Sequence, residues 1–241
     1  SSLQQLGDGV VLFDHPGHVM VNMGQDIKPL ETNDIEVSLM KTKDITTYYL
    51  KTQVPFPNLN ESILRSPDNF NEADYDLTSD NNLGIQWISH FKAQSINNNI
   101  ETLNTIFGVT PHTKFEHLLR AFYESFAYHT KQIFLNFEDH LGIVLKELKI
   151  AGPLKYHSFL MQYQADILQV PLVRYKQPLV RVMGAFLCLL LSRDSSFNTK
   201  SLKSILSVDK SYLPEMDPIS SLALYNEWKG YYDKVCQLQS Q

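Results

Sequence analysis

Residues 150–166 carry the clearest candidate for chemistry, because they combine a strand, a turn and a helix around a glycine. The segment reads IAGPLKYHSFLMQYQAD, an order of elements typical of loops that bind phosphate at the start of a helix. Such loops bring main-chain N–H groups close to phosphate, which favours glycine. Here Gly152 is followed at once by Pro153, which has no N–H and a fixed φ. The residues leave two alternatives open: a working nucleotide loop, or a helix start that keeps only its outline.

Other kinds of site find little support in the sequence. The eight histidines show no metal-binding pattern, because no cysteine or carboxylate set accompanies them at ligand spacing. Ser-His-Asp triads are arrangements in space, so the order of residues along one chain nominates none. The two cysteines make no disulfide framework, and Cys188 lies in the apolar run AFLCLLL. This pattern predicts a buried, inert thiol in a reducing compartment.

Charge and hydropathy limit the partners that we expect. The net charge of −5, with no stripe of Lys and Arg, argues against binding nucleic acid through its phosphates. The longest apolar stretch, at 182–191, is about half of the roughly 20 residues that span a membrane. The first residues lack the basic and apolar regions of a signal peptide. We therefore expect an intracellular, cytoplasmic protein that works without membrane or nucleic acid.

The elements that must position the loop fall into three parts. Residues 1–54 are β-rich, residues 55–82 read as a long connection or insertion, and residues 83–241 form a helical and α/β remainder of the same domain. The strands predicted in the first part are 10–13, 18–23, 35–40 and 45–54. In the last part, helical spacing of apolar residues predicts helices at 85–94, 99–107, 113–140, 156–168, 180–191 and 220–235, with strands at 147–152 and 171–175. This order favours one mixed β-sheet covered by helices on both faces and a C-terminal helix.

Four segments carry a family resemblance, in the same order and at similar spacing. Residues 159–174, 108–133, 82–91 and 208–235 resemble the C-terminal domain of the FGGY carbohydrate kinases, and the last of these resembles the tail of glycerol kinases. The resemblance implies an actin-like ATPase fold of the ribonuclease-H-like kind. It also implies two domains that clamp ATP and sugar, of which only the second is found here. The N-terminal domain is expected to be missing or to lie on a separate chain.

The nucleotide-binding positions implied by the resemblance have changed residue type. The Asp-Gly-Gly and downstream Asn of the family's adenosine loop correspond to Ala151, Gly152, Pro153 and His157. Proline suits the first turn of a helix and offers a nucleotide no N–H. The family's Glu-Thr-Thr-Ala-Leu-Gly before the apolar helix keeps only Gly184.

The phosphate hairpin and the catalytic base implied by the resemblance are also altered. The loop aligned with Leu-Gly-Thr-Ser-Gly-Thr is Met40–Asp44, in which no glycine is left. Lys41 and Lys43 there are either point charges for phosphate or solvated residues at a hairpin tip. Asp26, in VNMGQDIKP, corresponds to the sugar-activating base or is an ordinary turn aspartate.

We therefore predict a catalytically inactive, glycerol-kinase-like domain, a pseudokinase without a cofactor that serves as a structural or protein-interaction module. The alternative is the C-terminal half of a divergent, active glycerol or pentulose kinase that uses ATP and Mg²⁺, with Asp26 as base. A third possibility is a domain that binds a polyol or nucleotide without turning it over. Trp228, Tyr231 and Tyr232 lie close together at helical spacing, which indicates either core packing or a protein interface.

Overall fold

The computed structural model divides the chain into two compact units. The first contains Ser1–Gln53, Ile133–Tyr156 and Val170–Leu213, and the second contains Val54–Gln132, His157–Gln169 and Pro214–Gln241. The structure describes residues 7–12, 17–25, 35–41, 46–54, 81–92, 101–142, 144–152, 157–176 and 207–239. Residues 55–80 of the connection predicted at 55–82, the predicted helix at 180–191 and Cys188 lie outside these residues.

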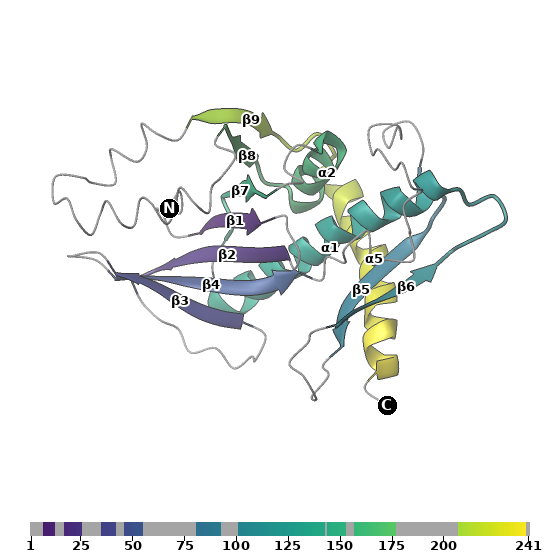
Figure 1. Ribbon diagram of the computed structural model, residues 1–241, viewed down its shortest axis with the longest axis horizontal. Coiled ribbons are helices and arrows are strands. Elements are labelled where there is room, and N and C mark those ends of the chain that lie inside the picture. The colour runs from purple at the N-terminus through teal and green to yellow at the C-terminus, as the bar shows by residue number, and fades with distance from the viewer. Residues whose placement is uncertain are drawn as a thin grey trace. The chain divides into compact units, whose positions relative to one another are not determined.

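The first unit is built on a seven-stranded mixed sheet (Figure 1). Its strands run in the order β3-β4-β2-β1-β7-β8-β9. β1 pairs antiparallel with β2 and parallel with β7, and β7 pairs parallel with β8. The bounds are β1 Asp8–Leu12, β2 Gly17–Gly24, β3 Ile35–Lys41, β4 Thr46–Val54, β7 Glu147–Ala151, β8 Leu172–Tyr175 and β9 Val208–Tyr212. The strands predicted from the sequence in these regions are confirmed.

One face of this sheet is apolar, and the ring of Phe134 packs against it at Gly9. Val11, Leu148 and Ile150 are at most 2% exposed. A Cβ at Gly9 would lie 2.9 Å from the Leu148 side chain and 3.5 Å from the Phe134 ring, so the absence of a side chain permits this close packing. The periodicity that predicts strands here is therefore the alternation of core residues with residues of the other face.

The second unit combines a hairpin with three helices. The hairpin pairs β5 (Gln86–Lys92) with β6 (Glu101–Phe107). The helices are α1 (Phe115–Leu141), α2 (Ser158–Leu168) and α5 (Pro218–Gln239). Of α1, the part up to Gln132 belongs to this unit and the rest to the first unit. Trp228 is fully buried and stacks between Tyr128 and Tyr232, with ring centroids 5.5 and 5.0 Å away. Of the two roles open to Trp228, the structure places it in the core.

The helices predicted at 85–94 and 99–107 are wrong, because both segments form strands. The four consecutive residues Gln86–Ser89 are all buried, so β5 is covered on both faces. A strand buried on both faces loses the alternation of apolar and polar residues that identifies a strand. Ile85, Ile88 and Phe91 then occur at a spacing that also fits a helix.

Candidate functional site

Gly152 lies at the edge of the first unit's sheet where open α/β folds bind ligands. It follows the last residue of β7, at the carboxyl ends of the parallel strands β1 and β7. Its φ of +98° falls in the region that glycine tolerates best. The neighbouring Ala151 is 3% exposed and places a methyl group where the family resemblance calls for a carboxylate. At this edge Gly152 has the positive φ that glycine allows, and residue 151 has no acid.

The end of β1 and the start of β2 also lie at this edge, and the sequence does not show that this places His18 there. Leu12 pairs with Ala151 on one side and with His18 on the other, so His18 lies two strands from Ala151, with Leu12 between them. The turn residues His15-Pro16-Gly17 are the signal that could have identified this hairpin as the neighbour of Gly152.

Lys41 lies far from Gly152. It ends β3, the outermost strand, and β4, β2 and β1 separate β3 from β7. Four strand spacings of about 4.8 Å place the two strands roughly 19 Å apart. β2 runs antiparallel to β1, so its end at Gly24 lies at the opposite edge of the sheet from Gly152. Asp26, Lys43 and Gly184 lie outside the described residues, and the structure does not bring Lys41 and Gly152 together.

His157, in the second unit, begins helix α2. It is the N-cap residue, and its Nδ1 accepts a hydrogen bond of 3.1 Å from the main-chain N–H of Leu160. A side-chain acceptor at this position satisfies one of the unpaired N–H groups of the first turn. The imidazole ring also packs against the buried Tyr123, with centroids 4.6 Å apart. One ring nitrogen and one ring face of His157 therefore already serve the fold.

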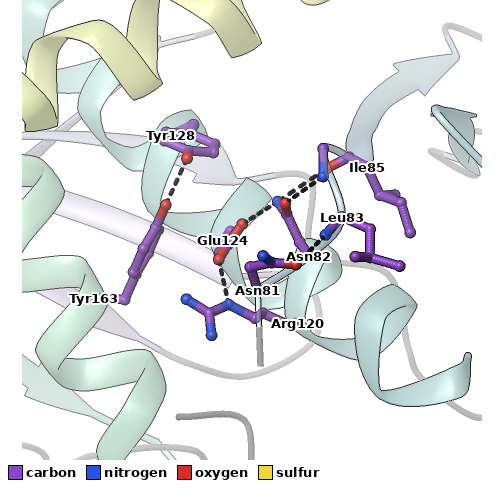
Figure 2. A network of polar contacts seen from close by, with 9 residues as sticks. Asn81, Asn82, Leu83, Ile85, Arg120, Glu124, Tyr128 and Tyr163 are labelled. Carbon is purple, nitrogen blue, oxygen red and sulfur yellow. Dashed lines mark hydrogen bonds and ion pairs between the residues drawn. The ribbon is translucent and has the colours of Figure 1, made fainter. Parts of the chain in front are cut away.

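Glu124 of α1 is the centre of a buried polar network in the second unit. Figure 2 shows its carboxylate between two donors, Asn82 Nδ2 at 2.6 Å and Arg120 Nε at 2.7 Å. Its side chain is 5% exposed, against 19% for Arg120. Burial raises the pKa of Glu124 above its usual value, against the opposing effects of Arg120 and Asn82. The sequence showed Arg120 and Glu124 one helical turn apart but gave no sign that Asn82, 42 residues away, completes the set.

The network fixes the turn that leads into β5. Asn82 Nδ2 also donates to the Ile85 carbonyl at 3.1 Å, and its Oδ1 accepts from the Gly84 N–H at 2.9 Å. Leu83, at φ +53°, and Gly84, at φ +75°, both adopt the left-handed conformation in this turn. Because a non-glycine residue at positive φ is costly, we infer that the surrounding bonds hold the turn in place.

Two tyrosines extend the polar region from α1 to α2. The hydroxyl groups of Tyr128 and Tyr163 are 2.6 Å apart (Figure 2). Burial raises the pKa of both groups, and the Glu124 charge raises it further. Both hydroxyls therefore stay protonated at neutral pH, and their bond joins the two helices.

Asp166, near the end of α2, holds the segment that precedes α5. Its Oδ1 accepts from the main-chain N–H groups of Glu215 at 2.7 Å and Met216 at 3.3 Å. Gln169 Nε2 donates to the Met216 carbonyl at 3.0 Å, which adds a second attachment. These contacts attach the main chain of the segment before α5 to the end of α2.

The described part of the chain offers neither a metal cluster nor a membrane span. Among its residues, no three His, Cys, Asp or Glu side chains gather in a way that could hold a metal ion. None of the helices described has a stretch both long and apolar enough to cross a bilayer.

The profile of the FGGY family of carbohydrate kinases, C-terminal domain, matches residues 39–192. A glycerol kinase of Alkaliphilus oremlandii is 39% identical over 136 residues, which are 56% of this chain and 27% of that protein. A glycerol kinase of Bacillus cytotoxicus is 36% identical over 129 residues, 54% of this chain and 26% of that protein. The matched segment thus spans only about a quarter of these relatives.

Solved structures match nearly the whole chain. The crystal structure of Plasmodium falciparum glycerol kinase with ADP has a TM-score of 0.79 at 19% identity, over 97% of this chain and 48% of that one. Xylulose kinase from Rhodospirillum rubrum has a TM-score of 0.74 at 14% identity, over 99% of this chain and 49% of that one. These similarities confirm the predicted α/β, actin-like ATPase fold, and the chain spans about half the length of both proteins.

Proposed function

Because the chain belongs to the FGGY family of carbohydrate kinases, through the C-terminal domain, we propose that it is a kinase-like domain that does not bind ATP and acts as a protein-interaction module. The chain would then keep the fold of the family without its phosphoryl-transfer chemistry. Phosphoryl transfer needs main-chain donors and metal at the phosphates and a carboxylate to accept the sugar proton. In this proposal the chain has lost the groups that bind the phosphates.

The observation that carries the proposal is that residues 151 and 157 make contacts within the fold at positions where the family pattern binds nucleotide. The methyl group of Ala151 is buried where the family pattern has an acid, and His157 spends a ring nitrogen on the first turn of α2. Both positions therefore contribute to folding. Pro153, between them, further removes a main-chain donor that phosphate would need.

A thermal-shift titration with ATP and Mg²⁺ tests the absence of nucleotide binding. A ligand at about 100 times its Kd would add about 2.7 kcal/mol of stability. For a chain of this size that corresponds to a rise in Tm of roughly 5–10 °C. We expect no shift, while glycerol kinase of Alkaliphilus oremlandii serves as the positive control. A saturable shift at sub-millimolar nucleotide would overturn the proposal.

The second candidate function is the C-terminal half of a divergent, active glycerol or pentulose kinase that uses ATP and Mg²⁺. It is favoured by the conformation of Gly152, which retains the positive φ of a ligand loop. Asp26 would then be the base that accepts the sugar proton. Its test is ATP-dependent sugar phosphorylation by this chain joined to an N-terminal kinase domain, and that activity should disappear in Asp26→Asn.

A further inference from the structure

The turn that leads into β5 has a conformation that it would not readily keep by itself. Leu83 has a φ of +53°, which a bulky residue rarely adopts, and it is 42% exposed. Its own N–H donates to Asn81 Oδ1 at 3.0 Å, a contact within the turn. The 2.6 Å bond from Asn82 Nδ2 to Glu124 instead joins the turn to α1. The attachment of the turn to the helix therefore depends on the Glu124 carboxyl group.

The protonation state of Glu124 decides how many hydrogen bonds it can accept. A carboxylate is an acceptor only, and here one oxygen accepts from Arg120 Nε and the other from Asn82 Nδ2. A neutral acid keeps one carbonyl oxygen, and its other oxygen carries a proton that needs an acceptor of its own. One of the two N–H donors must then lose its full bond. Because Arg120 is charged and makes the stronger bond, the neutral amide of Asn82 is the donor that gives way.

The surroundings of Glu124 make this protonation reachable in mild acid. Burial raises its pKa and outweighs the opposing effects of its two hydrogen-bond donors. Among the residues that the structure describes, the ionisable groups that face it are Arg120 and Tyr128 of α1 and Tyr163 of α2, and Glu227 of α5 acts on Tyr128. Both tyrosines stay protonated and arginine keeps its charge. Of Glu124 and the three groups that face it, only Glu124 therefore changes its charge on acidification.

We propose that Glu124 is a pH-dependent switch for the turn at residues 82–84: as a carboxylate it fixes the turn to α1, and as a neutral acid it releases the turn. The bonds within the turn do not involve Glu124, since Asn82 Oδ1 accepts from Gly84 and Asn82 Nδ2 also donates to Ile85. The turn therefore keeps its internal bonds and loses its anchor. This switch goes beyond the proposed function and does not depend on it.

Release of the turn changes an exposed apolar surface. The Gly84 carbonyl oxygen lies 2.8 Å from the position of a Cβ at Gly108, so the turn packs closely against the end of β6. Leu83 precedes the first of these glycines, and Val109, which is 58% exposed, follows the second. At neutral pH the switch holds Leu83 in a fixed position at this contact. In acid, the turn and the surface around Leu83 become mobile.

The switch gives the turn and the whole fold opposite responses to acid. The pKa of Glu124 is raised in the folded chain, so the folded chain binds this proton more tightly than the unfolded chain does. The contribution of Glu124 to the free energy of unfolding should therefore rise as pH falls through the folded-state pKa. If the turn only followed the stability of the fold, its protection would rise as well. Loss of protection in the turn alone is specific to the switch.

NMR titration from neutral pH to about pH 4 tests the switch in the wild type, Glu124→Gln and the control Glu116→Gln. Glu116 lies in the first turn of α1 and pairs with Lys114 at 3.6 Å. The side-chain amide signals of Asn82 should shift with the same midpoint as the carboxyl carbon of Glu124. The Gly84 amide should lose about tenfold in protection from exchange, after correction for the intrinsic effect of pH. Both responses should persist in Glu116→Gln and disappear in Glu124→Gln.

Two results of the wild-type titration would overturn the proposal without any variant. One is titration of Glu124 with no response at Asn82 or Gly84, and the other is no titration of Glu124 before the chain unfolds. An unchanged response in Glu124→Gln would overturn it too. Urea unfolding adds a second readout, in which the wild type should gain stability relative to Glu124→Gln as pH falls. A turn that gains protection together with the fold would contradict the switch.

Discussion

Substitutions at His157 separate its two contributions to the start of α2. The cap bond that Nδ1 accepts from the Leu160 N–H contributes about 1 kcal/mol, as typical N-caps do. The ring contact with Tyr123, at 4.6 Å, contributes about 0.5–1.5 kcal/mol as an aromatic pair. His157→Ala removes both and should lower the free energy of unfolding by about 1.5–2.5 kcal/mol. His157→Asn should lose only the ring, and His157→Phe only the cap.

Urea unfolding followed by circular dichroism measures these differences in one series. His157→Ala should show the lowest midpoint with an unchanged slope, and the losses of His157→Asn and His157→Phe should sum to about the loss of His157→Ala. If His157→Ala costs less than about 0.5 kcal/mol, the ring is not committed to the fold. The reasoning that removes His157 from nucleotide binding would then fail.

Substitutions at four further positions test other parts of the structure. Asp166→Ala should lower the free energy of unfolding by about 3 kcal/mol, because two main-chain N–H groups lose their acceptor. Asp166→Asn, whose Oδ1 can still accept, should lower it by about 1 kcal/mol. Equal losses of the two variants in urea unfolding would contradict the assigned bonds. Gly108→Ala should cost about 1–3 kcal/mol, because φ is +82° and a Cβ would lie 2.8 Å from the Gly84 carbonyl oxygen. Its control, Gly230→Ala in α5, meets nothing within 4 Å and should stabilise the chain by about 1 kcal/mol, so a loss there would count against the packing of α5. Hydrogen bonds from Ser220 hold the pKa of Asp217 below its usual value. The wild type should therefore have a higher free energy of unfolding than Asp217→Asn at neutral pH, and this difference should vanish as pH falls through the folded-state pKa. A difference that grows in acid, measured by urea unfolding, would contradict this sign.

Most strands of the first unit and the long helices could be predicted from the spacing of their apolar residues, even where burial is not one-sided, as at Ala121–Thr130 of α1. The strands of the first unit alternate between a core face and another face, and α1 and α5 carry apolar residues at helical spacing. β5 and β6 could not, because Ile85, Ile88 and Phe91 also fit helical spacing. The pairing of Gln86–Lys92 with Glu101–Phe107 makes both segments strands.

The candidate site was predictable in its residue types but not in its geometry. The sequence identified Gly152 and His157, and both lie at the ends of the elements expected around them. It did not show that Lys41 lies on the outermost strand, because strand order depends on contacts between segments far apart in the chain. The place of His18 at the same edge, across Leu12 from Ala151, was missed for the same reason, since it follows from two separate pairings of Leu12.

Calorimetric titration of the chain with ATP and Mg²⁺ tests the central claim most directly. It should run beside a variant that restores the family pattern through Ala151→Asp, Pro153→Gly and His157→Asn. The account predicts no saturable heat for the wild type, because its loop offers nucleotide neither the acid nor the main-chain donor that the variant regains. Saturable, one-to-one binding of ATP by the wild-type chain would contradict it.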